Sequence, residues 1–466
     1  MSHRGTFRER ILGGVAWATL SKFVQVVLGF SITALATRLL VPADVGVFHL
    51  AVHTVVVLGI VANLGVEQAV LQRLPGLVSP ADEARRNGYL RRATTIVVAV
   101  AGVVSFGYFF FGHDSVFAGL VDRPAVGVLA LPIALWAFAG ALQRFVGEGF
   151  RSLHLIRDSV LFGGVVQFGG ILSYLAITSA LLGLFVWSGS ASVTTVLWIG
   201  GAGTALVSLW GIGRLVGGRE RRMAPAGVPW APILLTAAPF LVNNLAQYLS
   251  KRSDIWMAGI LTGDDATGLY ATVAVLPALI NLPLTNANVV LAPAIGELFA
   301  QGKVDQLKRL VGLGPGLALI PAVLLALAFA VFGRQILTFA FGDYYAAGAV
   351  ILVILAVGQI VSVAVGSSGY VLMMAGRHVD LMWCSLFGAA VTIVAGFVGG
   401  RTAGLEGLAV GAAFGASVQQ LSKLVVARIR LGFWSHARPI RAAQRFAKFG
   451  WRLSSRGGDG QQGDDQ

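Results

Sequence analysis

Short, basic connections divide this chain into twelve long apolar segments. The segments lie at about 11–37, 45–71, 93–112, 124–147, 157–180, 192–216, 231–261, 268–297, 310–332, 345–374, 379–400 and 405–430. Each reaches the roughly 20 residues that a helix needs to cross a hydrocarbon core of about 30 Å. Charged residues make up only 12% of the chain, against about 25% in an ordinary soluble domain. The sequence therefore predicts an all-α polytopic membrane protein with twelve transmembrane helices.

Lysine and arginine are unevenly distributed between the two sets of connections. Alternate connections and the two ends carry 28 of the 35 basic residues, whereas the opposite connections carry only Arg38, Arg123, Arg334 and Arg401. Because short cytoplasmic loops retain Lys and Arg, both termini are predicted to be cytoplasmic in a multi-pass protein of the cytoplasmic membrane. The net charge of +14 is spread over these short segments. This pattern argues against a nucleic-acid partner.

The sequence also resembles itself at an offset of about 221–226 residues. RLLVPADVGVFHLAV (38–52) resembles GILTGDDATGLYATV (259–273), and SLHLIRDSVLFGG (152–164) resembles HVDLMWCSLFGAA (378–390). The repeat predicts two parallel six-helix lobes, one plan for secondary transporters that bind substrate between the lobes near mid-membrane. The predicted units are an N-terminal lobe (1–217), a cytoplasmic linker (218–230), a C-terminal lobe (231–430) and a basic, then disordered tail (431–466).

Polar side chains form stripes on several of the predicted helices. At about 100° per residue, the polar residues of 239–254 fall on one face, and the first two helices have similar faces. Lys and Asp are costly in hydrocarbon and normally face a protein interior or a hydrated cavity. The predicted cavity residues are Lys22, Gln25, His53, Asn63, Glu67, Asn243, Asn244, Gln247, Lys251 and Asp254.

Several of these side chains also have structural interpretations. Asn and Gln, including Gln25 and the helix-8 residues Asn281, Asn286 and Asn288, often bond neighbouring helices as packing groups. Glu67 could pair with Arg73, and Lys251 could simply neutralise Asp254 one turn away. His49 lies near the outer boundary and favours an interfacial role, while Arg252, off the stripe, could snorkel outward.

Motifs for enzymatic chemistry are missing from the sequence. It contains no Gly-x-x-x-x-Gly-Lys-Ser/Thr phosphate loop and no His-Glu-x-x-His spacing, and Cys384 is its single cysteine. No catalytic residue, metal site or cofactor is therefore expected. A scaffolding membrane protein remains an alternative, but it would leave the intramembrane charges unexplained.

Several segments together resemble a known transporter family. These are RLLVPADVGVFHLA, LGVEQAVLQRL (64–74), the turn with Asp264, Gly268 and Tyr270, FGDYYAAGAVILVILAVGQI (341–360), and LMMAGRHVDL (372–381) followed by GLEGLAVGAAFGASV (404–418). Over about residues 10–430 the chain resembles polysaccharide-biosynthesis flippases of the multidrug/oligosaccharidyl-lipid/polysaccharide (MOP) exporter superfamily. The resemblance implies two six-helix lobes in a V around a central cavity, and outward transport of lipid-linked sugars by alternating access.

Two transport functions follow from this resemblance and from the charges. A flippase would move a polyprenyl-(di)phosphate-linked oligosaccharide, with Lys22 and Lys251 attracting the phosphate linkage while the tail stays among membrane lipids. Glycosyltransferases or a polymerase of the same pathway are its candidate partners. The alternative is a cation-coupled multidrug exporter, which would use Asp254 and Glu67 as carboxylates. The presence of Lys22 and the scarcity of mid-membrane acids favour the flippase.

The predicted topology can be tested by single-cysteine labelling in a Cys384→Ser background. A cysteine placed within residues 85–92 should be protected from an impermeant thiol reagent added outside, because that loop is predicted to be cytoplasmic. A cysteine in the Asp264–Asp265 turn should be labelled. The reverse pattern would refute the topology.

Overall fold

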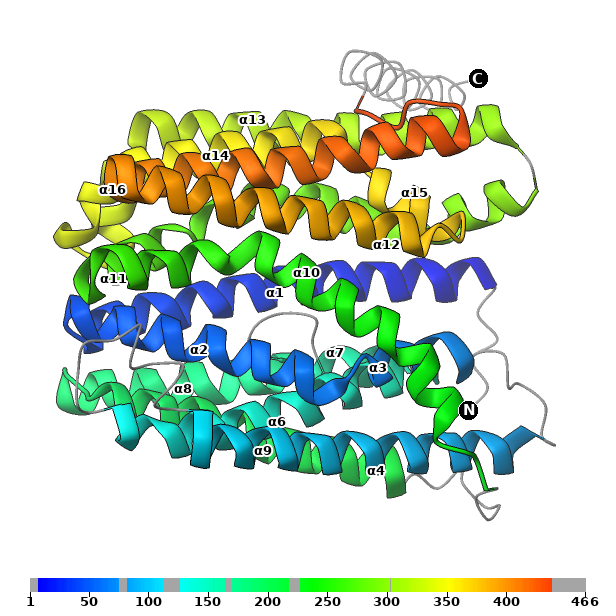
Figure 1. Cartoon of the computed structure of the whole chain (residues 1–466), viewed down its shortest axis with the longest axis horizontal. Helices are drawn as coiled ribbons and strands as arrows, with labels where there is room; N and C mark the ends of the chain where they lie inside the picture. Colours follow the sequence, from blue (N-terminus) through cyan, green and yellow to red (C-terminus); the bar gives the residue numbers. More distant parts are fainter. Residues whose placement is uncertain are drawn as a thin grey trace, which may run out of the picture.

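The computed structural model describes residues 7–74, 82–112, 126–153, 155–163, 169–217, 227–301 and 303–437, and within them it is all-helical (Figure 1). The first half contains α1 (Phe7–Leu39), α2 (Pro42–Asn63), α3 (Val66–Arg73), α4 (Glu83–Gly107), η3 (Tyr108–Gly112), α6 (Val126–Ser152), α7 (Ile156–Phe162), α8 (Ile171–Ser188) and α9 (Val193–Gly217). The second half contains α10 (Ala231–Thr262), α11 (Asp264–Val273), η4 (Leu276–Asn281), α12 (Leu282–Ala300), α13 (Val304–Phe341), η5 (Asp343–Gly348), α14 (Ala349–Val365), α15 (Ser368–Met374) and α16 (His378–Leu431). The predicted all-α class is confirmed.

The apolar segments account for the long helices. Ten helical stretches of the described residues are long and apolar enough to cross a membrane. The helix α10 is outside that set because its Asn, Gln and charged residues lower its hydropathy. The twelve-crossing count and the cytoplasmic position of the termini stay predictions. So do the lobe boundaries, and most of the linker (218–226) and of the tail (438–466) lies outside the described residues.

The last helix is two helices packed side by side. Backbone angles leave the helical region at Ala403 and Gly404, inside α16, which agrees with the predicted separation of 379–400 from 405–430. A Cβ added to Gly399 would lie 2.1 Å from the Gly407 carbonyl oxygen, and one added to Gly411 would lie 2.3 Å from that of Ala395. The chain therefore reverses direction at 403–404, and the two arms approach closely because these positions lack side chains.

The second apolar segment, 45–71, is not one continuous helix. Leu64 and Gly65 adopt positive φ angles of 50° and 78°, so α2 ends at Asn63 and α3 starts afresh at Val66. A Cβ on Gly65 would lie 2.4 Å from the carbonyl oxygen of Ala237 in α10, so both the conformation and the contact favour glycine. The polar face predicted on this segment is therefore not continuous, because the break changes the rotation of every later side chain.

Two helices of opposite halves meet through a reciprocal backbone contact. A Cβ on Gly46 of α2 would lie 2.2 Å from the Asp264 carbonyl oxygen, and one on Gly268 of α11 would lie 2.3 Å from that of Pro42. Pro42 and Asp264 are 222 residues apart, as are Gly46 and Gly268. A contact in which each partner contributes the same pair of positions is what a two-fold axis produces. The geometry agrees with the predicted internal repeat.

Further contacts tie the halves together. At the same end of the molecule, Arg38 Nη2 at the end of α1 donates a hydrogen bond of 3.1 Å to the carbonyl oxygen of Phe339 in α13. The helix α10 runs obliquely between the halves (Figure 1). Its Ile233 and Ala237 belong to the apolar cluster of the first half, whereas its later residues pack against α16 and α11.

The reciprocal contact predicts a difference between two glycine substitutions. Gly46→Ala should destabilise the protein, because its methyl group would overlap the Asp264 carbonyl and overpacking typically costs about 1–3 kcal/mol. Gly102→Ala in α4 is the control, since a Cβ there has no neighbour within 4 Å. The melting temperatures of the purified proteins compare the two. Equal melting temperatures would contradict the close contact.

Candidate functional site

The structure splits the polar stripe predicted on α10. Lys251 is exposed, and Asn243, Asn244 and Gln247 are partly exposed. Asp254 is only 6% exposed: its Oδ2 accepts a 2.8 Å hydrogen bond from the Tyr270 hydroxyl and its Oδ1 accepts one of 3.0 Å from the Ile255 amide. No ion pair among the described residues joins Asp254 to Lys251. Asp254 therefore stabilises the packing of α10 against α11 instead of neutralising Lys251.

Basic side chains from both halves converge near Lys251. Lys22 on α1 is within electrostatic reach of Lys251 and of Arg151 on α6. Lys423 on α16 is also within electrostatic reach of Lys251. Lys423 is 7% exposed, and its ammonium group donates a 3.1 Å hydrogen bond to Gln420 Oε1. Because like charges repel in a poorly screened site, this arrangement favours a bound anion.

We call Lys22, Arg151, Lys251 and Lys423 the basic cluster. The sequence did not predict Arg151 and Lys423 as cavity residues, because both belong to the basic residues that mark cytoplasmic segments. Lys423 lies well inside the last apolar segment, 405–430, so its intramembrane position was a signal that could have identified it. Nothing in the sequence alone places Arg151 near Lys22, because α6 and α1 are far apart in the chain.

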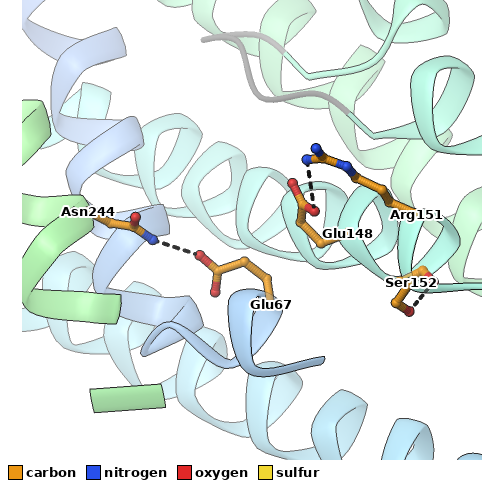
Figure 2. Close-up of polar contacts among 6 residues, drawn as sticks. Glu67, Glu148, Arg151, Ser152 and Asn244 are labelled. Carbon is orange, nitrogen blue, oxygen red and sulfur yellow. Dashed lines mark hydrogen bonds and ion pairs between the residues drawn. The ribbon is translucent and has the colours of Figure 1, made fainter. Parts of the chain in front are cut away.

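A buried carboxylate joins α3 to α10 (Figure 2). Glu67 is 1% exposed, and its Oε1 accepts a 3.1 Å hydrogen bond from Asn244 Nδ2. Its Oε2 has no partner within the described part of the chain. Figure 2 shows Glu148 and Arg151 of α6 nearby, paired at 3.5 Å. Glu67 thus bonds Asn244, and the alternative pairing with exposed Arg73 is not formed.

The two predicted polar residues of α2 have different surroundings. The Nδ1 atom of His53 shares a 2.6 Å hydrogen bond with the Tyr248 hydroxyl of α10. Asn63 is fully buried and donates hydrogen bonds to the carbonyl oxygens of Gly59 and Ala141. His53 therefore lies at the contact between the halves, whereas Asn63 packs α2 against α6.

The asparagines of the eighth apolar segment act mainly within the second half. Asn281 Nδ2 donates hydrogen bonds to Gln359 Oε1 at 3.2 Å and to the Ser362 hydroxyl at 3.1 Å. Asn288 accepts a hydrogen bond from Ser367. These bonds agree with the interpretation of both residues as packing groups between helices.

A cavity of about 130 Å³ lies between α1, α2, α8, α10 and the α11–η4 segment. Its polar lining includes Gln25, Thr33, His49, His53 and Arg252. Gln25 was predicted to face a cavity. His49 and Arg252 were given interfacial or outward-reaching roles, which the structure does not support. The sequence gives the distance of each residue from the end of its apolar segment. It does not show which helices pack around that residue, and for this reason both roles were wrong.

The position of Asp254 predicts which pairs of mutations interact. Asp254→Asn and Tyr270→Phe should be non-additive by about 0.5–3 kcal/mol, because they remove the two ends of one buried hydrogen bond. Asp254→Asn and Lys251→Ala should be additive, since no contact joins these side chains. Melting of the purified single and double mutants measures both pairs. Strong coupling to Lys251 and none to Tyr270 would contradict the structure.

Comparisons with known proteins agree with this architecture. A family model described as polysaccharide biosynthesis protein matches residues 11–299. The lipid II flippase MurJ in an inward closed conformation has a TM-score of 0.70 at 11% identity, with 88% of this chain and 87% of MurJ covered. An inward-facing multidrug transporter of the MATE family has a TM-score of 0.69 at 12% identity, with 88% and 94% covered.

A MOP superfamily transporter from Pyrococcus furiosus has a TM-score of 0.63 at 12% identity, with 92% of this chain and 97% of that chain covered. No curated protein sequence matches the chain. At these identities the structural likeness shows the fold alone, and that fold is the one shared by MOP superfamily transporters. The family match covers more than half of the 466 residues. The chain belongs to the polysaccharide biosynthesis protein family.

Proposed function

We propose that the protein is a flippase that moves a polyprenyl-(di)phosphate-linked oligosaccharide outward across the cytoplasmic membrane by alternating access. The observation that carries this proposal is the convergence of Lys22, Lys251 and Lys423 from helices of both halves. The family match and the similar fold of a lipid II flippase support it. The basic cluster would hold the phosphate linkage.

The sugar head is the physical obstacle to this transport. Each hydroxyl moved into hydrocarbon without a partner costs several kcal/mol, about 4–8 on the cyclohexane scale. Partly exposed amides such as those of Asn243 and Gln247 can replace the lost water contacts. The lipid tail then stays in the bilayer while only the head crosses between the halves.

The direction of transport has an electrostatic contribution. Outward movement of an anion down an inside-negative potential is favoured by about 2.3 kcal/mol per charge per 100 mV. To release the substrate, the side chains of the basic cluster must move apart, because cations that stay together would retain the phosphate. Rearrangement of α10, which contacts both halves, would separate Lys251 from Lys22 or from Lys423.

A second candidate, a cation-coupled multidrug exporter, draws on one observation. Glu67 is a buried carboxylate with an unpartnered oxygen, so it could hold a proton or a cation. The other carboxylate that this function would use, Asp254, already accepts hydrogen bonds at both oxygens. Of the two acids predicted for the exporter, only Glu67 has a free oxygen, whereas the flippase draws on three lysines in one region, which favours the flippase.

The two functions differ in what purified protein transports in liposomes. A flippase should translocate a fluorescent polyprenyl-diphosphate sugar and should not move a cationic dye. Protein-free liposomes give the background rate. Dye efflux that depends on Glu67, without movement of the glycolipid, would establish the exporter instead. In that case glycosyltransferases or a polymerase would no longer be expected as partners, because they were proposed for a flippase of a glycan pathway.

Lys251 provides the sharpest test of the phosphate site. Lys251→Ala should abolish translocation of the polyprenyl-diphosphate sugar, whereas Lys251→Arg should retain part of it because the charge remains at a similar depth. Lys251→Ala with Asp254→Ala should also be inactive. Lys303→Ala is the matched control, since Lys303 is exposed before the start of α13. Normal translocation by the Lys251→Ala protein would show that the anion binds elsewhere.

A further inference from the structure

The cavity of about 130 Å³ lies beside the basic cluster but is lined by different groups, among them an amide, two imidazoles and a guanidinium. Gln25 lies one helical turn beyond Lys22 on α1, and Arg252 follows Lys251 on α10. His49 and His53 of α2 complete its polar wall. A ligand whose phosphate lies among the lysines would therefore place its next chemical group at this cavity.

Two polar groups of the cavity have no hydrogen-bond or ion-pair partner among the described residues. His49 is 3% exposed, and its Nε2 atom has no hydrogen-bond partner among the described residues. Arg252 forms no ion pair in the same part of the chain. The nearby carboxylate of Asp254 acts on Arg252 electrostatically, but its two oxygens are engaged by Tyr270 and Ile255. In the tautomer that carries its proton at Nε2, His49 is a buried donor. Together with a guanidinium that has no bound acceptor, it favours a ligand that carries an oxyanion.

Apolar side chains complete the lining of the cavity. Val26 and Phe30 of α1 face it, together with Val275, Ala278 and Leu279 of the second half. A lining of both polar and apolar side chains suits a pyranose ring, which has hydroxyl groups at its edge and C–H groups on its faces. The volume is similar to the roughly 150 Å³ of an engineered cavity that binds benzene. The space is therefore on the scale of a single ring, not of an oligosaccharide.

We propose that this cavity binds a single carboxylate-bearing sugar unit of the transported glycan, a hexuronate, with Arg252 as the carboxylate ligand and His49 as a hydrogen-bond donor. This inference rests on the proposed function for the origin of the sugar. A guanidinium presents two parallel N–H groups that match the two oxygens of a carboxylate. The basic cluster next to the cavity is left for the phosphate linkage, so the two anionic groups have separate sites.

The test measures binding of free monosaccharides to the purified full-length protein by calorimetry. Glucuronate should bind about 10- to 150-fold more tightly than glucose, because a charge-assisted hydrogen-bond pair contributes about 1.5–3 kcal/mol. Equal affinities for glucuronate and glucose would overturn the proposal. Glucose 1-phosphate can bind through the basic cluster, so Arg252→Gln should weaken glucuronate binding more than glucose 1-phosphate binding. An equal loss for both ligands would overturn the assignment of a carboxylate to Arg252.

Variants locate the binding in the cavity. Arg252→Gln should weaken glucuronate binding about tenfold, and Arg252→Lys should recover part of it, since it keeps the charge and loses the planar fork. Arg401→Gln is the matched control, because Arg401 is exposed over the ring of Phe397. If Arg252→Gln does not fold, His49→Phe serves instead and should also weaken binding. Unchanged glucuronate binding by a folded Arg252 or His49 variant would overturn the proposal.

The liposome assay separates this inference from the proposed function. Protein that translocates a neutral polyprenyl-diphosphate sugar but does not bind glucuronate retains the flippase function and refutes the hexuronate site. Protein that binds glucuronate through Arg252 but moves no lipid-linked sugar retains the site and refutes the flippase function.

Discussion

The cost of placing charge in hydrocarbon governs where every functional candidate in this protein lies. Lys22, Lys251 and Arg252 are among the basic residues that the sequence places deep within apolar segments. In the structure Arg252 lines a cavity between helices, and Lys22 and Lys251 are within electrostatic reach of each other. A lone cation at the bilayer centre costs about 2.5–3.5 kcal/mol on insertion scales. Gathering several cations in one place would add repulsion, so the cluster is consistent with a site for an anionic substrate.

The contacts between the two halves differ along their length. At the end that contains Gly46 and Gly268, backbone meets backbone with no room for a side chain. Farther along, polar side chains join the halves, as His53 does with Tyr248 and Glu67 with Asn244. Beside these bonds, the backbone of Gly65 lies against that of Ala237 in α10, again with no room for a side chain. The halves are therefore closely packed at two glycine positions and joined by polar bonds between them.

The sequence predicted the all-helical class and the division at Ala403–Gly404, because both depend on local apolarity and local turn residues. The reciprocal contact of Gly46 with Gly268 agrees with the repeat that residues 38–52 and 259–273 suggested. The prediction of the site was less complete. A helical-wheel analysis assumes uninterrupted rotation, and the left-handed residues Leu64 and Gly65 reset the orientation of Glu67. Asn63 and Asp254 were assigned to the cavity, but they bond neighbouring helices.

By itself, the sequence determined that this chain is a helical membrane protein whose intramembrane charges need partners. Composition, segment length and the distribution of Lys and Arg are sufficient for that conclusion, because the bilayer acts on each segment separately. Only the tertiary structure decided which charges meet. Lys423 joins Lys251, Arg252 faces a cavity with His49, and Asp254 bonds Tyr270. These partners come from helices that are distant in the chain, and local periodicity contains no information about which distant helices pack together.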